Sequence, residues 1–252
     1  MDIHKFYRPI LTHFRAKRMA ELCRLFAING KTRIVDVGGY EFNWMLIKEA
    51  PEVLMINLES EEWQRGRFRK QRGDGRALEL EDNSFDIAFS NSVIEHVGEW
   101  ADQVAFAREI RRVAPSYYVQ TPNRYFFFEP HLLAPFVHLF PRRVLRRIVR
   151  YGTGWGLMTK PTQEQVDSFL QSIRLLTKAE MKRLFPDADI IEEKILGLTK
   201  SLIAVRKSTI RIGADLRTQQ LEPSCRNEGR QPCIGTVIAL HADGAAIDRP
   251  TS

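Results

Sequence analysis

The stretch from Arg33 to Glu59, RIVDVGGYEFNWMLIKEAPEVLMINLE, constrains the fold more than any other part of the sequence. It contains two short apolar runs, residues 34–37 and 53–56, separated by a glycine pair and by apolar residues at helical spacing. Uninterrupted β-branched runs of this length are typical of parallel strands that are buried on both faces. The order strand, glycine turn, helix, strand and acidic residue predicts a nucleotide-binding type of βαβ unit.

The glycine turn indicates which kind of nucleotide such a unit accepts. Gly38 and Gly39 allow the backbone to approach a ligand closely, and a carboxylate at Glu59 can accept both hydroxyls of a ribose. The GxGxxG pattern of a dinucleotide site is absent, and Glu41 would repel a pyrophosphate at the start of the helix. We therefore expect a nucleoside without phosphate, which disfavours the alternative of a nicotinamide-dependent oxidoreductase.

Length and composition fit one α/β domain with an appendage. The chain has 252 residues, of which 44% are hydrophobic. The sequence contains no apolar run long enough to span a bilayer and no signal-peptide core at its start. Because the three cysteines lack metal-ligand spacing, we expect no metal site and a reduced, cytoplasmic setting. The net charge of +7 leaves an acidic partner, nucleic acid or membrane surface open.

A second informative block, GDGRALELEDNSFDIAFSNSVIEHV, occupies residues 73–97. Its apolar run at 85–90 predicts a central strand that ends in small polar residues, including Asn91. Ligands of open α/β sheets bind at the carboxyl ends of the strands. We therefore expect Asp74 and Asn91 to face the same crevice as the glycine turn.

The order of DVGG, NLE and the block at residues 73–97 resembles the class I S-adenosylmethionine-dependent methyltransferases. It is most similar to a small bacterial group that carries a "GD…LP…D.SFD.V.S..VIEHV" block. The segment TPNRYFFFEPH, residues 121–131, also resembles a recurring stretch of this group. The resemblance covers residues 30–207 approximately. It implies a Rossmann-like α/β fold with seven strands, mostly parallel, closed by an antiparallel terminal hairpin, and S-adenosyl-L-methionine as the cofactor.

The resemblance also implies a set of cofactor-binding residues near the ends of the early strands. Asp36 would lie near the methionine part, Glu59 would hold the ribose and Asp74 would border the adenine. Where the family most often has D-x-G-x-G-x-G, Tyr40 and Phe42 replace the second and third glycines, so the turn must have a different shape. A methyltransferase-fold protein without activity is therefore an alternative. The full implied set is Asp36, Gly38, Gly39, Glu59, Asp74, Gly75 and Asn91.

Two histidines are candidates for catalysis. Methyl transfer is an in-line displacement at a sulfonium methyl, so the protein mainly aligns the acceptor and excludes water. If the acceptor is a hydroxyl, a base must take its proton, and histidine is suited to this near neutral pH. His96 and His131 each lie close to a glutamate near a predicted strand end. For each histidine, a packing or capping role is the competing interpretation.

The sequence divides into three regions. We expect an N-terminal helical cap at residues 1–30, the domain at 31–207 with a helical lid insertion at 124–160, and a flexible tail at 208–252. The insertion combines aromatic residues with arginines at spacings of three and four in residues 142–150. Such a basic amphipathic helix can contact an anionic membrane surface or hold a lipid-like substrate. A lid with solvated arginines is the competing interpretation.

The expected partner is a small-molecule methyl acceptor, with an amphipathic one left open. Peripheral membrane contact through residues 124–151 also stays open. Because the sequence has no recognisable RNA-binding module or basic–aromatic stacking platform, we do not expect a nucleic-acid partner. An RNA methyltransferase that uses the basic surface is nevertheless an alternative. The sequence does not indicate an oligomeric state.

Three further segments carry clear local patterns. Residues 100–113 predict an amphipathic helix, and residues 188–206 predict two strands joined by a turn. Thr177 followed by Glu180 has the spacing of a capping box at a helix start. The predicted buried stripe of the first helix is Val104, Ala107, Ile110 and Val113.

Overall fold

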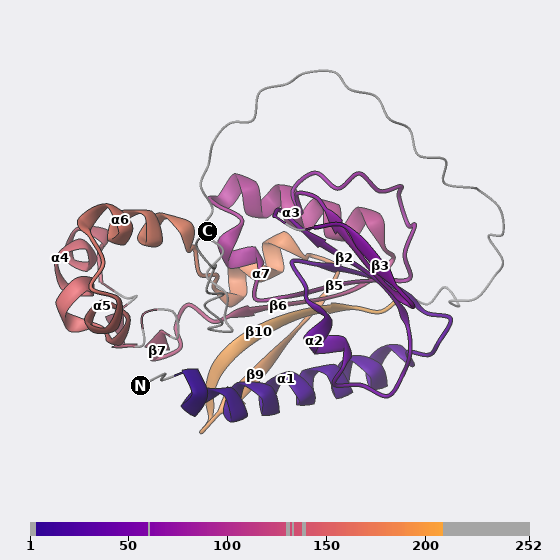
Figure 1. The fold of residues 1–252 in the computed structure, drawn as a ribbon, viewed down its shortest axis with the longest axis horizontal. Coiled ribbons are helices and arrows are strands. Elements are labelled where there is room, and N and C mark those ends of the chain that lie inside the picture. Colours follow the sequence, from indigo (N-terminus) through magenta and orange to yellow (C-terminus); the bar gives the residue numbers. More distant parts are fainter. Residues whose placement is uncertain (1–3, 60, 130–131, 133, 138–139, 209–252) are drawn as a thin grey trace, which may run out of the picture.

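The computed structural model describes residues 4–59, 61–129, 132, 134–137 and 140–208. Its centre is an eight-stranded sheet with the order β3-β4-β2-β1-β5-β6-β10-β9 (Figure 1). The predicted C-terminal tail lies outside the described residues, apart from Ser208. The strands of the sheet are β1 (Arg33–Val37), β2 (Glu52–Asn57), β3 (Trp63–Arg65), β4 (Phe68–Arg72), β5 (Ile87–Asn91), β6 (Ser116–Pro122), β9 (Asp189–Ile195) and β10 (Leu198–Arg206).

The pairing of the strands confirms the predicted fold class. Five adjacent strands pair in parallel, in the order β4, β2, β1, β5 and β6. Strand β10 is antiparallel to both β6 and β9. The sheet has one strand more than the seven predicted, because β3 pairs antiparallel with β4 at the edge. Gly66, with φ of +57°, forms the tight turn between these two strands.

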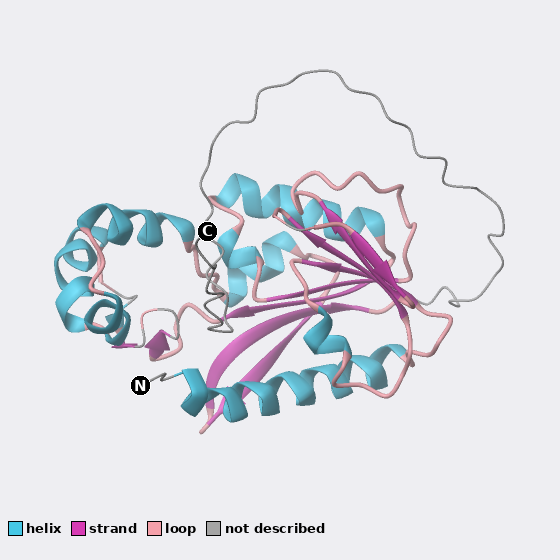
Figure 2. Cartoon of the chain, in the orientation of Figure 1, coloured by secondary structure: helices cyan, strands magenta, loops and turns pink. Residues whose placement is uncertain are grey.

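Helices cover both faces of the sheet, as Figure 2 shows. Helix α1 (His4–Phe26) and the single turn α2 (Glu41–Trp44) pack on one face. Helices α3 (Trp100–Val113) and α7 (Lys178–Leu184) pack on the other. Alternate residues of β1 feed the two apolar clusters, Ile34 toward α1 and Val35 toward α3. This alternation explains why the strand reads as an unbroken apolar run in the sequence.

Two local predictions are corrected and two are confirmed. The helix predicted after the glycine turn is only one turn long and ends at Trp44, because that ring is buried beneath the sheet. In α3 the exposed residue is Val104, and Phe106 faces the core in its place. The capping box of Thr177 and Glu180 is present at the start of α7. The terminal hairpin is present as β9 and β10.

Residues 124–173, here called the helical insertion, have an apolar cluster of their own. They contain the two-stranded β7 (Phe128–Glu129) and β8 (Ala134–Pro135) and three helices. The helices lie beside the sheet and not on either of its faces (Figure 1). None of the described helices is both long and apolar enough to cross a membrane. The helices are α4 (Arg142–Gly152), α5 (Gly154–Thr159) and α6 (Gln163–Ser172), and their cluster comprises Leu132, Ala134, Val137, Leu145, Val149, Val166 and Phe169.

Candidate active site

The structure brings the predicted cofactor residues to one edge of the sheet. They lie at or just beyond the carboxyl ends of four adjacent parallel strands, β4, β2, β1 and β5. Parallel strands end at the same edge, which is where open α/β sheets bind ligands. The residues at this edge are Asp36, Gly38 and Gly39 from β1, Glu59 from β2, Asp74 and Gly75 from β4, and Asn91 from β5.

The glycine turn is held by the neighbouring strand β2. The Gly38 N–H donates to the Ile56 carbonyl at 2.7 Å, and the Asn57 side-chain amide donates to the Gly39 carbonyl at 2.8 Å. Gly38 has φ of +81°, and a Cβ there would come within 2.4 Å of a Val93 methyl. Only glycine therefore fits this position without strain. The sequence analysis missed Asn57, although its place at the end of β2 was visible.

Asp36 is a fully buried carboxylate beside the turn. Its Oδ2 accepts a hydrogen bond of 2.8 Å from the Trp44 indole, and its Oδ1 has no hydrogen-bond partner among the described residues. Burial raises the pKa of Asp36 to about 7, against the opposing effect of the Trp44 hydrogen bond. A Cβ at Gly39 would lie 1.8 Å from Oδ2, so this glycine is required by the carboxylate that packs on it.

A cavity of about 380 Å³ opens between the ends of β2 and β4. Ile56, Leu78 and Leu80 give it apolar walls, while Asp74 and Glu79 place carboxylates on its rim. Apolar faces together with a carboxylate acceptor suit a purine ring that carries an exocyclic amine. Another cavity, of about 350 Å³, lies between α1 and residues 46–49 and is lined by none of the predicted site residues.

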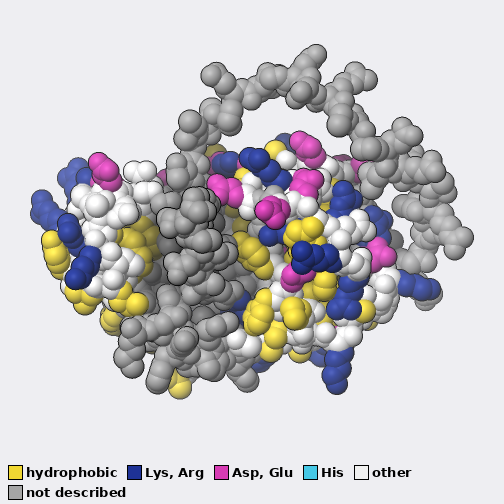
Figure 3. All heavy atoms as spheres, viewed as in Figure 1, with side chains coloured by type: hydrophobic (Ala, Val, Ile, Leu, Met, Phe, Trp, Pro, Cys, Tyr) yellow, Lys and Arg dark blue, Asp and Glu magenta, His cyan; other side chains and the backbone are white. Residues whose placement is uncertain are grey.

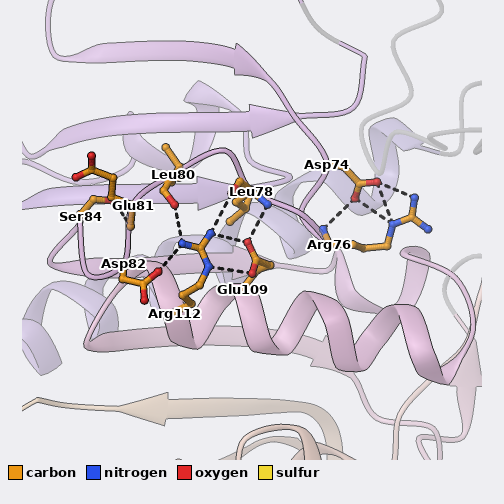
Figure 4. A network of polar contacts seen from close by, with 9 residues as sticks. All are labelled: Asp74, Arg76, Leu78, Leu80, Glu81, Asp82, Ser84, Glu109 and Arg112. Atoms are coloured by element: carbon orange, nitrogen blue, oxygen red, sulfur yellow. Dashed lines mark hydrogen bonds and ion pairs between the residues drawn. The ribbon is translucent and has the colours of Figure 1, made fainter. Parts of the chain in front are cut away.

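The loop that follows β4 is fastened to α3 by Arg112 (Figure 4). The Arg112 guanidinium donates to the carbonyls of Leu78 and Leu80 at 2.9 and 2.6 Å. It also donates to both carboxylate oxygens of Glu109, which accepts in turn from the Leu78 N–H. The hydrogen bond from Arg112 lowers the pKa of Glu109, so that carboxylate stays ionised and accepts the hydrogen bond from the Leu78 N–H of the loop. One wall of the cavity is thereby positioned.

Asp74 is paired within its own turn. Arg76 donates to its carboxylate from Nε and Nη2, at 3.0 and 2.7 Å, and also from its backbone N–H. Burial alone would raise the pKa of Asp74, but the hydrogen bonds from Arg76 outweigh it and lower that pKa. The carboxylate is therefore a fixed anionic acceptor. Gly75 packs against Phe106 and Val37, where a Cβ would come within 2.8 Å of both side chains.

Helix α1 reaches the same edge through Arg18. This buried guanidinium donates to Asn91 Oδ1 at 2.9 Å and forms two hydrogen bonds with Glu193 on β9. Lys200 lies 3.6 Å from Glu193 and 3.8 Å from the centre of the Phe14 ring. The sequence analysis missed Arg18 because its partners lie 73 and 175 residues away along the chain.

The two candidate histidines have different positions. His96 ends the short 3-10 helix η1 (Ile94–His96) that follows β5 and is half-buried. The neighbouring Glu95 is fully buried, and it accepts a hydrogen bond of 2.9 Å from Thr121. His131 lies outside the described residues. Among the described residues, no group of three acidic, histidine or cysteine side chains is arranged to hold a metal ion.

The residues at the edge fit an adenosine-containing cofactor. The cavity offers apolar walls and carboxylates, and Asp36 Oδ1 is a buried acceptor that a ligand amine would satisfy. The strand order, with an antiparallel strand inserted between β6 and β9, defines the class I methyltransferase fold. The fold is therefore that of the class I methyltransferases, and the residues at this edge fit a nucleoside cofactor.

Comparison with known families agrees with this class. Residues 38–116, from the glycine turn to the start of β6, match the family model of the methyltransferase domain. The chain carries a methyltransferase domain over these residues, and it is an enzyme whose cofactor is S-adenosylmethionine. The resemblance seen in the sequence is thus confirmed. A search of the curated proteins finds no significant match.

Solved structures resemble this chain at low identity. The PH0226 protein from Pyrococcus horikoshii is 16% identical, with 75% of this chain and 87% of that chain covered and a TM-score of 0.46. A SAM-dependent methyltransferase from Methanosarcina mazei is 15% identical, with 71% and 94% covered and a TM-score of 0.41. The [4+2]-cyclase SpnF is 17% identical with a TM-score of 0.38, and the match spans 44% of this chain and 46% of the cyclase.

Proposed function

We propose that this enzyme methylates a small molecule at the carboxyl edge of the sheet, beside the ends of β5 and β6. The observation that carries the proposal is the way the helical insertion is fastened there. The Arg124 N–H donates to the Leu176 carbonyl at 3.0 Å, and the Arg174 N–H donates to the Glu95 carbonyl at 2.8 Å. The first bond holds the two ends of the insertion together, and the second ties its C-terminal end to η1, just beyond β5, which supports its role as a cover over a small acceptor.

The proposed cofactor contacts follow the order of the strands. Glu59, exposed three residues beyond Ile56, would accept the ribose hydroxyls. Asp74 would accept the exocyclic amine of adenine at the cavity, with Gly75 beside the ring. Asp36 and the turn at Gly38 and Gly39 would lie near the methionine part, and Asn91 would lie close to the reacting end.

The chain's own residues then have simple tasks. S-adenosylmethionine, when bound, supplies an electrophilic methyl group on a sulfonium. The protein aligns the acceptor with that methyl and excludes water, which would solvate and block it. If the acceptor is a hydroxyl, His96 would take its proton, since η1 follows β5 at the same edge. His131 is retained as the other candidate base.

Calorimetry with S-adenosylhomocysteine tests the cofactor contacts. Glu59→Ala and Asp74→Ala should each weaken binding roughly ten- to a hundredfold, because a hydrogen bond to a charged group is worth about 1.5–3 kcal/mol. Glu81→Ala is a matched control, since Glu81 is an exposed carboxylate of the same loop and does not line the cavity. Unchanged affinity in either test variant would reject that residue's assignment.

Transfer of a labelled methyl group tests the acceptor class. The enzyme is incubated with radiolabelled S-adenosylmethionine and with separated lipid, aqueous-metabolite and RNA fractions of a bacterial extract. We expect label in one of the two small-molecule fractions, and His96→Ala should lower its rate if the acceptor is a hydroxyl. Label confined to RNA would instead identify an RNA methyltransferase and overturn the small-molecule proposal.

A further inference from the structure

The first part of the helical insertion, residues 124–160, carries a large excess of positive charge. Residues 124–160 contain seven lysines and arginines and one glutamate, which gives a net charge of +6, against +7 for the whole chain. Five of these arginines fall within α4, where no acidic residue occurs. Glu164 and Asp167 lower the net charge of the whole insertion to +4, so its excess of positive charge is concentrated on α4.

Helix α4 separates its apolar and basic residues into two faces. Leu145 and Val149 point into the cluster of the insertion and are buried. Arg143, Arg147 and Arg150, at spacings of four and three, share the opposite face. Among the described residues these three arginines have no acidic partner, whereas the neighbouring Arg146 pairs with Asp167 of α6 at 2.5 Å.

Large apolar side chains remain exposed beside this arginine face. On α4, Tyr151 is 71% exposed and Val144 lies seven residues before it, on the same side of the helix. On α5, Leu157 is 62% exposed and Met158 is also exposed. Figure 3 shows hydrophobic and basic side chains mixed at this end of the molecule, where Figure 1 places α4 and α5. The core of the insertion is already filled by other residues, so these side chains are not part of it.

We propose that this surface of α4 and α5 binds the anionic face of a lipid bilayer. Arginines and exposed apolar residues on one face are the pattern of helices that lie in the bilayer interface. The arginines would meet the lipid phosphates, while Tyr151, Leu157 and Met158 would enter the region of the headgroups and upper acyl chains. The inference goes beyond the proposed function, because it concerns where the enzyme sits and not which molecule it methylates.

Two other occupants fit this surface less well. A second copy of the chain would bring two segments of +6 charge against each other, which opposes self-association through this face. Nucleic acid would satisfy the arginines and could stack one base on Tyr151, but it would leave the exposed aliphatic side chains of Val144, Leu157 and Met158 without apolar contact. An anionic bilayer satisfies both the charge and the exposed apolar area.

Vesicle co-sedimentation of the full chain tests this surface. We expect binding to vesicles of phosphatidylcholine with phosphatidylglycerol and little binding to phosphatidylcholine alone. The triple variant Arg143→Gln, Arg147→Gln, Arg150→Gln should bind the anionic vesicles roughly a hundredfold more weakly at low salt, because each arginine contributes about fivefold. The double variant Tyr151→Ser, Leu157→Ser should weaken binding less, and mainly at high salt, where only apolar insertion remains.

A matched control separates this face from net charge. The variant Arg69→Gln, Arg108→Gln, Arg183→Gln removes the same charge from exposed arginines of β4, α3 and α7 and should bind as the unchanged chain does. Far-UV circular dichroism checks that every variant is folded. Equal loss in both triple variants, no vesicle binding by the unchanged chain, or tighter binding to an RNA oligonucleotide than to the vesicles would each overturn the proposal.

Discussion

The helical insertion exposes more of its aromatic rings than the rest of the described chain, here called the sheet domain. In the sheet domain Phe89 and Phe106 are buried, each in the cluster of one sheet face. In the insertion Phe169 is buried in the small cluster, whereas Phe136 and Phe140 remain exposed. The contrast indicates that the sheet domain uses its apolar area mainly to fill the two clusters on the faces of the sheet. The insertion uses part of its apolar area as a surface.

The polar contacts of the two parts also differ, both in their separation along the sequence and in their burial. In the sheet domain Arg18 joins α1 to β9 across 175 residues of sequence, and Arg112 fixes a whole loop. In the insertion Arg146 forms an exposed pair with Asp167, 21 residues away. Long-range buried contacts make a unit that unfolds as a whole, whereas local exposed ones allow a part to open by itself.

The largest expected effect comes from removing a buried ring from the apolar core of each part. Phe106→Ala removes a fully buried ring from the sheet domain and should cost about 3–5 kcal/mol of global stability. Phe169→Ala removes a ring that stacks on Trp155 at 4.5 Å within the insertion, and it should increase exchange there alone. Hydrogen exchange read by mass spectrometry measures both. If Phe169→Ala raised exchange equally in β1 and β5, the two parts would form one cooperative unit.

Much of the fold was predictable from the sequence, because it rests on local patterns. The unbroken apolar runs of β1 and β5 and the spacing of Thr177 and Glu180 each determine their element within a few residues. Strand β3 was not predictable, since the basic segment around Gly66 has no alternating apolar pattern. It pairs because the turn at Gly66 brings it back onto β4. The short α2 was missed because its end is set by burial of Trp44.

The candidate site was predictable in position and less so in detail. Strand ends and glycines marked the edge where Asp36 and Asp74 lie, since parallel strands share that edge. The contacts of Arg18 with Asn91 and of Arg112 with the loop were not predictable, because each joins residues far apart in sequence. Periodicity carries no information about such pairs. The cofactor and catalytic roles assigned to the edge residues remain predictions.

A smaller expected effect is on the pH dependence of stability, which differs in sign between the two parts. The ordinary pKa of an aspartate is 3.8, and burial raises that of Asp36 in the sheet domain to about 7. The folded state therefore holds this proton more tightly than the unfolded state, so stability falls as the pH rises from about 4 to about 7. In the insertion, hydrogen bonds from Arg146 lower the pKa of Asp167. The effect on stability is therefore the reverse, because stability is lost as the pH falls below about 4.

Urea unfolding of Asp36→Asn tests the first of these effects. The unchanged chain should lose stability on the order of a few kcal/mol between pH 5 and pH 8, and Asp36→Asn should remove most of that loss. Asp82→Asn is the control, because Asp82 is exposed. If the variant kept the full loss, another group would be its source, and Asp36 would be ionised at little cost.

The smallest expected effect compares one arginine from each part. Arg112→Ala should cost about 2–3 kcal/mol of stability, because it leaves the carbonyls of Leu78 and Leu80 without their donor and Glu109 without its partner. Arg146→Ala should cost less than about 1 kcal/mol, since an exposed ion pair contributes little. Arg112→Ala should also weaken S-adenosylhomocysteine binding, because the loop that it releases forms a wall of the cavity, whereas Arg146→Ala should leave binding unchanged. Equal stability losses in urea unfolding, or weaker ligand binding in Arg146→Ala, would show that the insertion is bound into the cofactor site as tightly as the loop after β4.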